Sequence, residues 1–136
     1  MSKTILVARV LLGLAFVVFG LNGFLHFFAP PPSANPEAAA LGGALAGSYI
    51  FTLMSATELV AGVLLLAGRF VPLALLLLAP ILVNIVGFHL ALDRVGTGLG
   101  AFLLVLELVI AWGYRDAFKM MIDARPARRL QDAPAS

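Results

Sequence analysis

The sequence predicts an all-α integral membrane protein, a bundle of four transmembrane helices with both termini in the cytoplasm. Three observations lead to this prediction. Hydrophobic residues make up 62% of the 136 residues and charged residues only 12%, more apolar surface than a water-soluble domain of this length can bury. The apolar residues form long runs that proline, glycine and charged residues interrupt. Most basic residues flank these runs, as topology signals do.

The longest apolar run, residues 49–92, organises the rest of the chain. As one helix it would be roughly 66 Å long at about 1.5 Å per residue, twice the bilayer core of about 30 Å. The segment 68–72, Gly-Arg-Phe-Val-Pro, interrupts it with a flexible glycine, an arginine suited to headgroups and a proline suited to a first helical turn. We therefore expect a transmembrane hairpin with spans at about 48–67 and 70–92.

Two further runs complete the predicted bundle as a single domain over residues 1–136. The first span, about 5–28, ends before the prolines at 30–32. It is too long for a signal peptide and has no clear small-x-small cleavage site, so we expect it to be retained.

The fourth span, about 99–118, follows a polar turn with two glycines and precedes a basic tail at 119–136. Between the first two spans, the segment 35–47 is rich in alanine and glycine. It could begin the second helix early or lie along the membrane interface, and the sequence leaves both open.

The placement of the basic residues predicts the orientation. Four spans bring both termini to one side, and the positive-inside rule makes that side cytoplasmic, in the inner membrane. Only Arg94 falls on the other side, and the basic residues of the terminal side are Lys3, Arg9, Arg69, Arg115, Lys119, Arg125, Arg128 and Arg129. The net charge of +2 therefore indicates topology and not nucleic-acid binding. Short connections on both sides of the third span predict that the last three spans are antiparallel neighbours.

Several polar residues fall inside the predicted spans, where ionisable groups are costly and usually face the bundle interior. Two glutamates lie near mid-bilayer, two asparagines slightly nearer the outer surface and two histidines nearer still. They form the candidate binding site: Asn22, His26, Glu58, Asn84, His89 and Glu107. On a helical projection the glutamates and Asn84 share stripes with small residues, such as Pro80, Asn84 and Gly87, which predicts close helix–helix contacts.

Two buried carboxylates at one depth cannot both be ionised at low cost, so either one is protonated or an arginine reaches them. Arg9 is the basic residue placed to do so from within a span. An Arg9–Glu58 ion pair would either lock the bundle or line a ligand pocket, and both remain open. Alternatively, the long arginine side chain could reach the cytoplasmic surface.

The residue types limit the chemistry. The chain has no cysteine, which excludes disulfides, iron–sulfur clusters and thiol redox chemistry by this chain alone. We assign no metal site, phosphate-binding loop or catalytic residue. Haem ligation by His26 and His89 would need facing rings, which the projection of His89 does not provide. A quinone headgroup, held by His, Asn or Glu in an apolar cleft, demands less geometry.

Short motifs over residues 5–118 resemble the DoxX-like family of four-helix membrane proteins. They are Arg9-Val-Leu-Leu-Gly13 with Phe19-Gly20-Leu21-Asn22-Gly23-Phe24, Thr57-Glu58 through Gly68, and Ala79-Pro80 through His89. The lysine that many members carry after the first glycine motif is absent, since Gly23 and Phe24 occupy that region. The resemblance implies a link to quinone-coupled sulfur oxidation or to membrane complexes against oxidative stress, without a catalytic assignment.

The leading functional hypothesis is thus a membrane subunit of a redox or oxidative-stress system that binds a quinone-like lipophilic molecule. The first alternative is a non-enzymatic scaffold or assembly partner, whose buried polar groups only specify helix packing. The second is a small transporter or proton path that uses Glu58 and Glu107. The expected partners are the lipid bilayer and proteins of a membrane complex; a homo-oligomer is left open.

Overall fold

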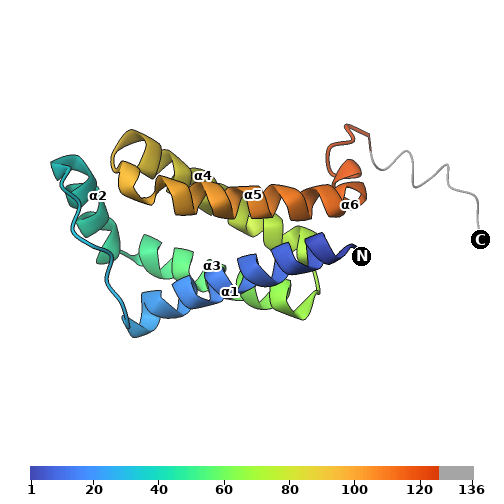
Figure 1. Cartoon of the computed structure of the whole chain (residues 1–136), viewed down its shortest axis with the longest axis horizontal. Helices are drawn as coiled ribbons and strands as arrows, with labels where there is room; N and C mark the ends of the chain where they lie inside the picture. The colour runs from blue at the N-terminus through green and yellow to red at the C-terminus, as the bar shows by residue number, and fades with distance from the viewer. Residues whose placement is uncertain (126–136) are drawn as a thin grey trace, which may run out of the picture.

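The computed structural model describes residues 1–125, and this part of the chain contains helices and connecting loops without strands (Figure 1). The elements in chain order are α1 (Lys3–Leu25), α2 (Pro36–Ala46), α3 (Tyr49–Ala67), α4 (Val71–Ala91), the 3-10 turn η1 (Arg94–Gly96), α5 (Thr97–Gly113) and α6 (Arg115–Lys119). Most of the predicted tail 119–136, with Arg128 and Arg129, lies outside the described residues.

Four helical segments are long and apolar enough to cross a membrane: α1, α3, α4 and the continuous run of η1 with α5. The prediction of four candidate spans is confirmed at this level. Each helix also exposes large apolar side chains on its outer face, for example Leu53, Val83 and Leu108. Such a continuous apolar exterior is typical of a surface that contacts lipid.

The first span ends three residues before its predicted end at residue 28. His26 adopts a left-handed conformation (φ 51°) and donates its backbone N–H to the carbonyl of Asn22 at 2.9 Å. The Asn22 side chain accepts a hydrogen bond from the Phe28 amide at 2.9 Å. The two bonds close the helix C-terminus before the prolines are reached.

The predicted hairpin forms at the expected break. Gly68 takes a left-handed conformation (φ 67°), which glycine adopts at the lowest cost, and its N–H closes α3 on the carbonyls of Leu64 and Leu65. Phe70 also has a positive φ (53°), and α4 begins immediately after it, with Pro72 in the first turn. The chain therefore reverses over three residues, and α3 packs beside α4.

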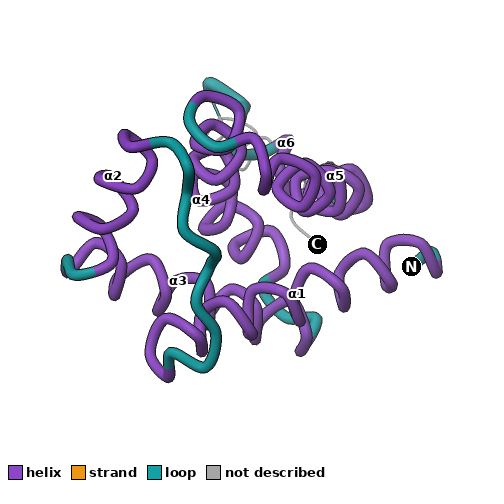
Figure 2. The backbone as a smooth tube through the Cα atoms, turned by 60° about the vertical axis from the view of Figure 1, so that its left-hand side comes forward, coloured by secondary structure: helices purple, strands orange, loops and turns teal. Residues whose placement is uncertain are grey.

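The segment 35–47 forms a separate helix, α2, and not the beginning of α3. The side chain of Asn35 accepts a hydrogen bond from the amide of Glu37 at 2.9 Å and so caps α2. The Asn35 amide nitrogen also donates to the carbonyl of Leu92 at 2.7 Å, which ties this segment to the end of α4. After a break at Gly47 and Ser48, α3 starts in a different direction (Figure 2).

The four long helices form a ring in which α1 packs against α3 and α5, and α4 packs against the same two helices. The predicted adjacency of the last three spans is confirmed. Helices α3 and α5 stand diagonally across the bundle. Thirteen residues form the buried apolar core: Ala8, Leu12, Phe16, Ala61, Leu65, Val71, Ala74, Leu75, Leu78, Leu82, Leu103, Leu106 and Ile110.

The closest helix contact joins α1 and α3, whose backbones approach at glycines. A Cβ atom on Gly20 would lie 2.7 Å from the backbone nitrogen of Leu59, and one on Gly62 would lie 2.8 Å from that of Val17. Such distances leave no room for a side chain. The small residues of the two helices therefore allow direct backbone contact, as in many membrane helix pairs.

The two ends of the bundle differ in chemistry. The N-terminus and α6 lie at one end and α2 at the other (Figure 1). We call the first the basic end, because it carries Lys3, Arg69, Arg115 and Lys119, and the second the α2 end.

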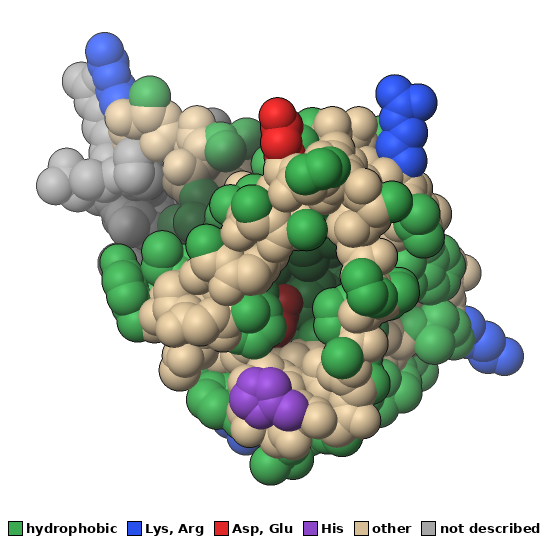
Figure 3. All heavy atoms as spheres, turned by 90° about the vertical axis from the view of Figure 1, so that its left-hand side faces the viewer, with side chains coloured by type: hydrophobic (Ala, Val, Ile, Leu, Met, Phe, Trp, Pro, Cys, Tyr) green, Lys and Arg blue, Asp and Glu red, His purple; other side chains and the backbone are tan. Residues whose placement is uncertain are grey.

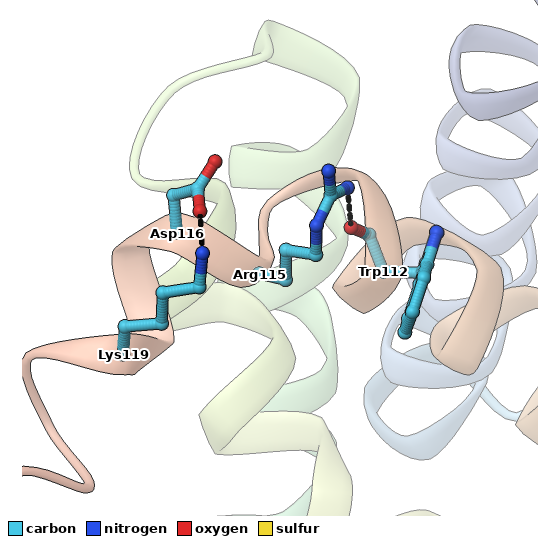
Figure 4. Close-up of polar contacts among 4 residues, drawn as sticks. All are labelled: Trp112, Arg115, Asp116 and Lys119. Atoms are coloured by element: carbon cyan, nitrogen blue, oxygen red, sulfur yellow. Dashed lines mark hydrogen bonds and ion pairs between the residues drawn. The ribbon is translucent and has the colours of Figure 1, made fainter.

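The predicted fourth span, 99–118, is divided at the basic end: α5 stops at Gly113, and α6 is a separate short helix. Around this break, the Arg115 guanidinium lies 5.2 Å from the Trp112 ring centre and donates to the Trp112 carbonyl (Figure 4). In α6 the hydrogen bond from Lys119, together with its positive charge, lowers the pKa of Asp116. The combination of tryptophan, arginine and lysine is typical of a membrane–water boundary.

Candidate functional site

Two glutamates are buried inside the bundle. The exposed fraction is 4% for Glu58 on α3 and 6% for Glu107 on α5. They lie nine and ten residues from the α2 end of their helices, a depth of about 14–15 Å at 1.5 Å per residue. Because α3 and α5 stand diagonally across the ring and both residues are on buried faces, the carboxyl groups approach the shared interior from opposite sides.

Two buried polar atoms of α3 and α5 lack hydrogen-bond partners. Oε1 of Glu107 and Oγ of Ser55 are both buried and unbonded. Ser55 is 1% exposed and lies one turn from Glu58, against Gly23 of α1, where a Cβ would overlap its hydroxyl. Ser55 was not among the predicted site residues, although it shares the helical stripe of Glu58. A buried polar group without a hydrogen-bond partner lowers the free energy of unfolding by about 1–3 kcal/mol. These two atoms are therefore candidates for hydrogen bonds to a ligand.

The bundle is hollowed at the α2 end. Figure 3, a view onto this end, shows an opening between the helices that is lined mainly by apolar side chains, with an acidic side chain within it. At the basic end, by contrast, Ile5 of α1 packs closely against Gly113 of α5. The hollow therefore exposes a buried acidic side chain toward the α2 end.

Arg9 does not join this site. Its guanidinium lies against Gly68 at the C-terminus of α3, where a Cβ atom would overlap it, and its buried Nε has no hydrogen-bond partner. The predicted ion pair between Arg9 and Glu58 does not form within residues 1–125, which the structure describes. Gly68 lies ten residues beyond Glu58, about 15 Å along α3. The arginine charge is therefore far from Glu58 and close to the C-terminus of α3, where the helix dipole attracts cations.

Asn22 and His26 close the end of α1 and do not enter the interior. The Asn22 side chain is occupied by the Phe28 amide. His26 is the left-handed residue that ends the helix, and it is exposed. His26 lies one residue beyond α1, so it does not continue the helical face that carries Asn22.

The His89 ring also makes its contacts with residues that are close to it in the sequence. Its Nδ1 lies 2.8 Å from the Asp93 carbonyl oxygen, and its ring packs against Gly96 so closely that a Cβ there would overlap it. The ring stabilises the turn between α4 and α5. No group of three or more His, Asp or Glu residues within 1–125 could hold a metal ion.

Asn84 lies on the outer face of the bundle. It is exposed, and its amide nitrogen donates to the Pro80 carbonyl at 2.8 Å. The predicted close helix contact at Pro80, Asn84 and Gly87 is wrong, because nothing lies within 4 Å of a Cβ placed on Gly87 and the buried face of α4 is the one with Leu75, Leu78 and Leu82. Asn84 instead borders a groove of about 560 Å³ between α3 and α4.

Of the six predicted binding residues, the structure therefore buries two, Glu58 on α3 and Glu107 on α5, and it also buries Ser55 of α3 against α1. These features define a class: a four-helix bundle able to cross a membrane, with carboxyl groups buried at mid-depth. Comparison with models of known families, with curated proteins and with solved structures finds no match to this chain. The resemblance to the DoxX-like family rests on the short motifs alone and stays a prediction.

Proposed function

We propose that this chain is a multi-pass protein of the cytoplasmic membrane that binds a quinone-like lipophilic molecule in the interior between α3 and α5. It would serve as the membrane subunit of a redox or oxidative-stress system. The observation that carries the proposal is a pair of buried polar groups without hydrogen-bond partners, Ser55 on α3 and Glu107 on α5; Glu58 is buried as well. In a bilayer core no water is available to satisfy such groups.

The chemistry of the interior fits a quinone in both of its redox states. A neutral carboxyl group offers one O–H donor and an acceptor oxygen, and a serine hydroxyl offers both functions. The carbonyls of a quinone accept hydrogen bonds, and the hydroxyls of a hydroquinone donate them. A carboxyl group on each of two diagonal helices could therefore bind one ring oxygen in either state.

The surroundings favour a lipophilic ligand. The hollow at the α2 end is lined mainly by apolar side chains, a lining that suits a hydrophobic ring and its tail. The resemblance to the DoxX-like family, some of whose members are linked to quinone-coupled oxidation, supports the same ligand class. The electron donor or acceptor would come from a partner protein, since the chain has no cysteine.

Native mass spectrometry of protein purified gently from membranes tests the proposal. We expect a quinone at about one molecule per chain. The variants Glu58→Met and Glu107→Met, which keep the side-chain length but remove both the donor and the acceptor of the carboxyl group, should each raise the quinone Kd about two- to tenfold, the value of one hydrogen bond. Glu37→Met, on the exposed first turn of α2, is the matched control and should bind as the wild type does.

Two results would contradict this function. If a folded protein carries only bulk phospholipid, the scaffold hypothesis is favoured, and its support is the direct backbone packing of α1 on α3. If quinone is absent but a pH step drives proton uptake in proteoliposomes, and Glu58→Gln or Glu107→Gln abolishes it, the two carboxyls form a proton path. A stoichiometric haem would require the histidines to rearrange from their present positions.

A further inference from the structure

The outer face of α4 carries polar groups that a membrane would leave unsatisfied. Asn84 lies seven residues from the α2 end of α4, about 10 Å inside a span, and is exposed. One N–H of its side chain bonds to Pro80, but no described donor reaches its Oδ1. Because Pro80 has no N–H, the carbonyl of Leu76 also loses its helical partner.

The same face permits a close approach. Gly87 lies one turn beyond Asn84, and a Cβ placed on it would meet nothing within 4 Å. Leu76, Pro80, Asn84 and Gly87 repeat at intervals of four, four and three, so they form one stripe along α4. An asparagine within a stripe that includes a glycine is the combination that joins helices in membranes.

Beside this stripe runs the groove of about 560 Å³ between α3 and α4, bordered by Met54, Thr57, Leu77 and Asn84. The Thr57 hydroxyl already has a hydrogen-bond partner, because it donates to the Leu53 carbonyl at 2.8 Å. The open hydrogen-bonding capacity at the groove therefore belongs to the Asn84 amide and the Leu76 carbonyl. A saturated lipid chain offers neither with a hydrogen-bond partner.

We propose that two copies of this chain associate through the outer face of α4, with the Asn84 side chain of each copy hydrogen-bonded to Asn84 of the other. A carboxamide is self-complementary, since it carries both donors and an acceptor. Two copies inserted in the same orientation are related by a twofold axis along the membrane normal, which places identical residues at identical depth. The exposed Val83 of each copy then inserts into the groove of the other.

This proposal is independent of the proposed quinone site, because Asn84 lies outside the bundle and Glu58 and Glu107 inside it. It requires only that the four helices cross a membrane. Charged or strongly polar partners are a poor fit, since the stripe and groove are otherwise apolar. A second copy supplies the complementary amide without any other component.

Disulfide cross-linking in native membranes tests the dimer, and the absence of native cysteine removes background. Gly87→Cys places a thiol on the proposed interface, and we expect it to form a covalent dimer on mild oxidation. Ala101→Cys is the matched control, because it is exposed and lies four residues from the same end of the bundle on the neighbouring helix α5. It should remain monomeric at the same expression level.

Adding Asn84→Leu to the Gly87→Cys variant should reduce the cross-linked fraction and raise the dimer Kd by about threefold or more, the lower range for a hydrogen bond between membrane helices. Asn84 is exposed, so the monomer should fold normally, which thermal unfolding can verify. Equal cross-linking of the two cysteine variants, no cross-linking at Gly87, or no effect of Asn84→Leu would each overturn the proposal and favour lipid as the occupant.

Discussion

At the scale of single residues, the role of an asparagine side chain depends on whether its backbone lies at a helix end or in mid-helix. Asn22 and Asn35 both bind backbone amides near helix ends, whereas Asn84 is in mid-helix with an open carbonyl oxygen. The sequence places Asn22 and Asn84 at comparable depth, and it cannot distinguish a cap from an open amide. That distinction depends on where a helix stops, which a few hydrogen bonds decide.

Arg9 provides a test of whether the buried glutamates depend on a cation. In the structure it lies at the end of α3 beside Gly68 and forms no ion pair. Arg9→Met keeps a long side chain and removes the charge. We expect the free energy of unfolding to fall by no more than about 1 kcal/mol, the value of a cation at a helix C-terminus.

A double-mutant cycle with Glu58→Gln makes this prediction specific. Without an ion pair, the effects of Arg9→Met and Glu58→Gln on unfolding should add within about 0.5 kcal/mol. A buried pair would behave differently, because removing one partner leaves a charge uncompensated and costs about 3–5 kcal/mol. A large coupling energy would show that the two residues interact in the membrane.

At the scale of helices, the number and order of the spans could be predicted because both follow from the length and hydropathy of each run. The hairpin break was predictable for the same reason, since glycine and proline mark it. The orientation of α4 about its own axis was not. Its sequence is hydrophobic all round, so the stripe with Pro80, Asn84 and Gly87 was identifiable as a stripe, but nothing local showed whether it faced inward.

The candidate site was predictable in part for a related reason. Glutamates within an apolar span are costly to expose to lipid, so they usually face the bundle interior. Their presence in the spans is therefore enough to predict that they are buried. Ser55 was missed as a site residue because serine is common at helix contacts. Only the structure shows that its hydroxyl is buried without a partner.

The contact of α1 with α3 leads to a prediction about Gly20. An added methyl group would lie 2.7 Å from the Leu59 nitrogen and 2.8 Å from the Ser55 carbonyl oxygen. Backbone atoms cannot move aside as a side chain does, so Gly20→Ala should lower the free energy of unfolding by about 1–3 kcal/mol. Reversible unfolding in lipid nanodiscs or detergent measures it.

The matched control is Gly42→Ala in α2, where a Cβ would meet nothing within 4 Å. Alanine favours a helix over glycine by about 0.5–1 kcal/mol, so this variant should be as stable as the wild type or slightly more so. If both variants behave alike, the close approach of α1 and α3 relaxes in the membrane, and the small residues serve another purpose.

At the scale of the whole molecule, the two ends have separate roles. The basic end holds the helices together, with Gly113 against Ile5 and Gly68 against Arg9, while the α2 end is hollow above the buried acids. The side on which each end lies decides where a ligand or proton would enter. The basic residues within 1–125 predict the orientation of the bundle in the membrane. Arg94 is near the α2 end, and the others lie toward the basic end.

We therefore expect the basic end in the cytoplasm and the α2 end outside, by the positive-inside rule. Single cysteines report this directly, because the native chain has none. Met120→Cys marks the basic end and Ala40→Cys marks α2; both positions are exposed. A membrane-impermeant maleimide should label Ala40→Cys in intact cells, and Met120→Cys only after the membrane is permeabilised. The reverse pattern would place the hollow on the cytoplasmic side, and a partner acting on its ligand would then have to be sought there.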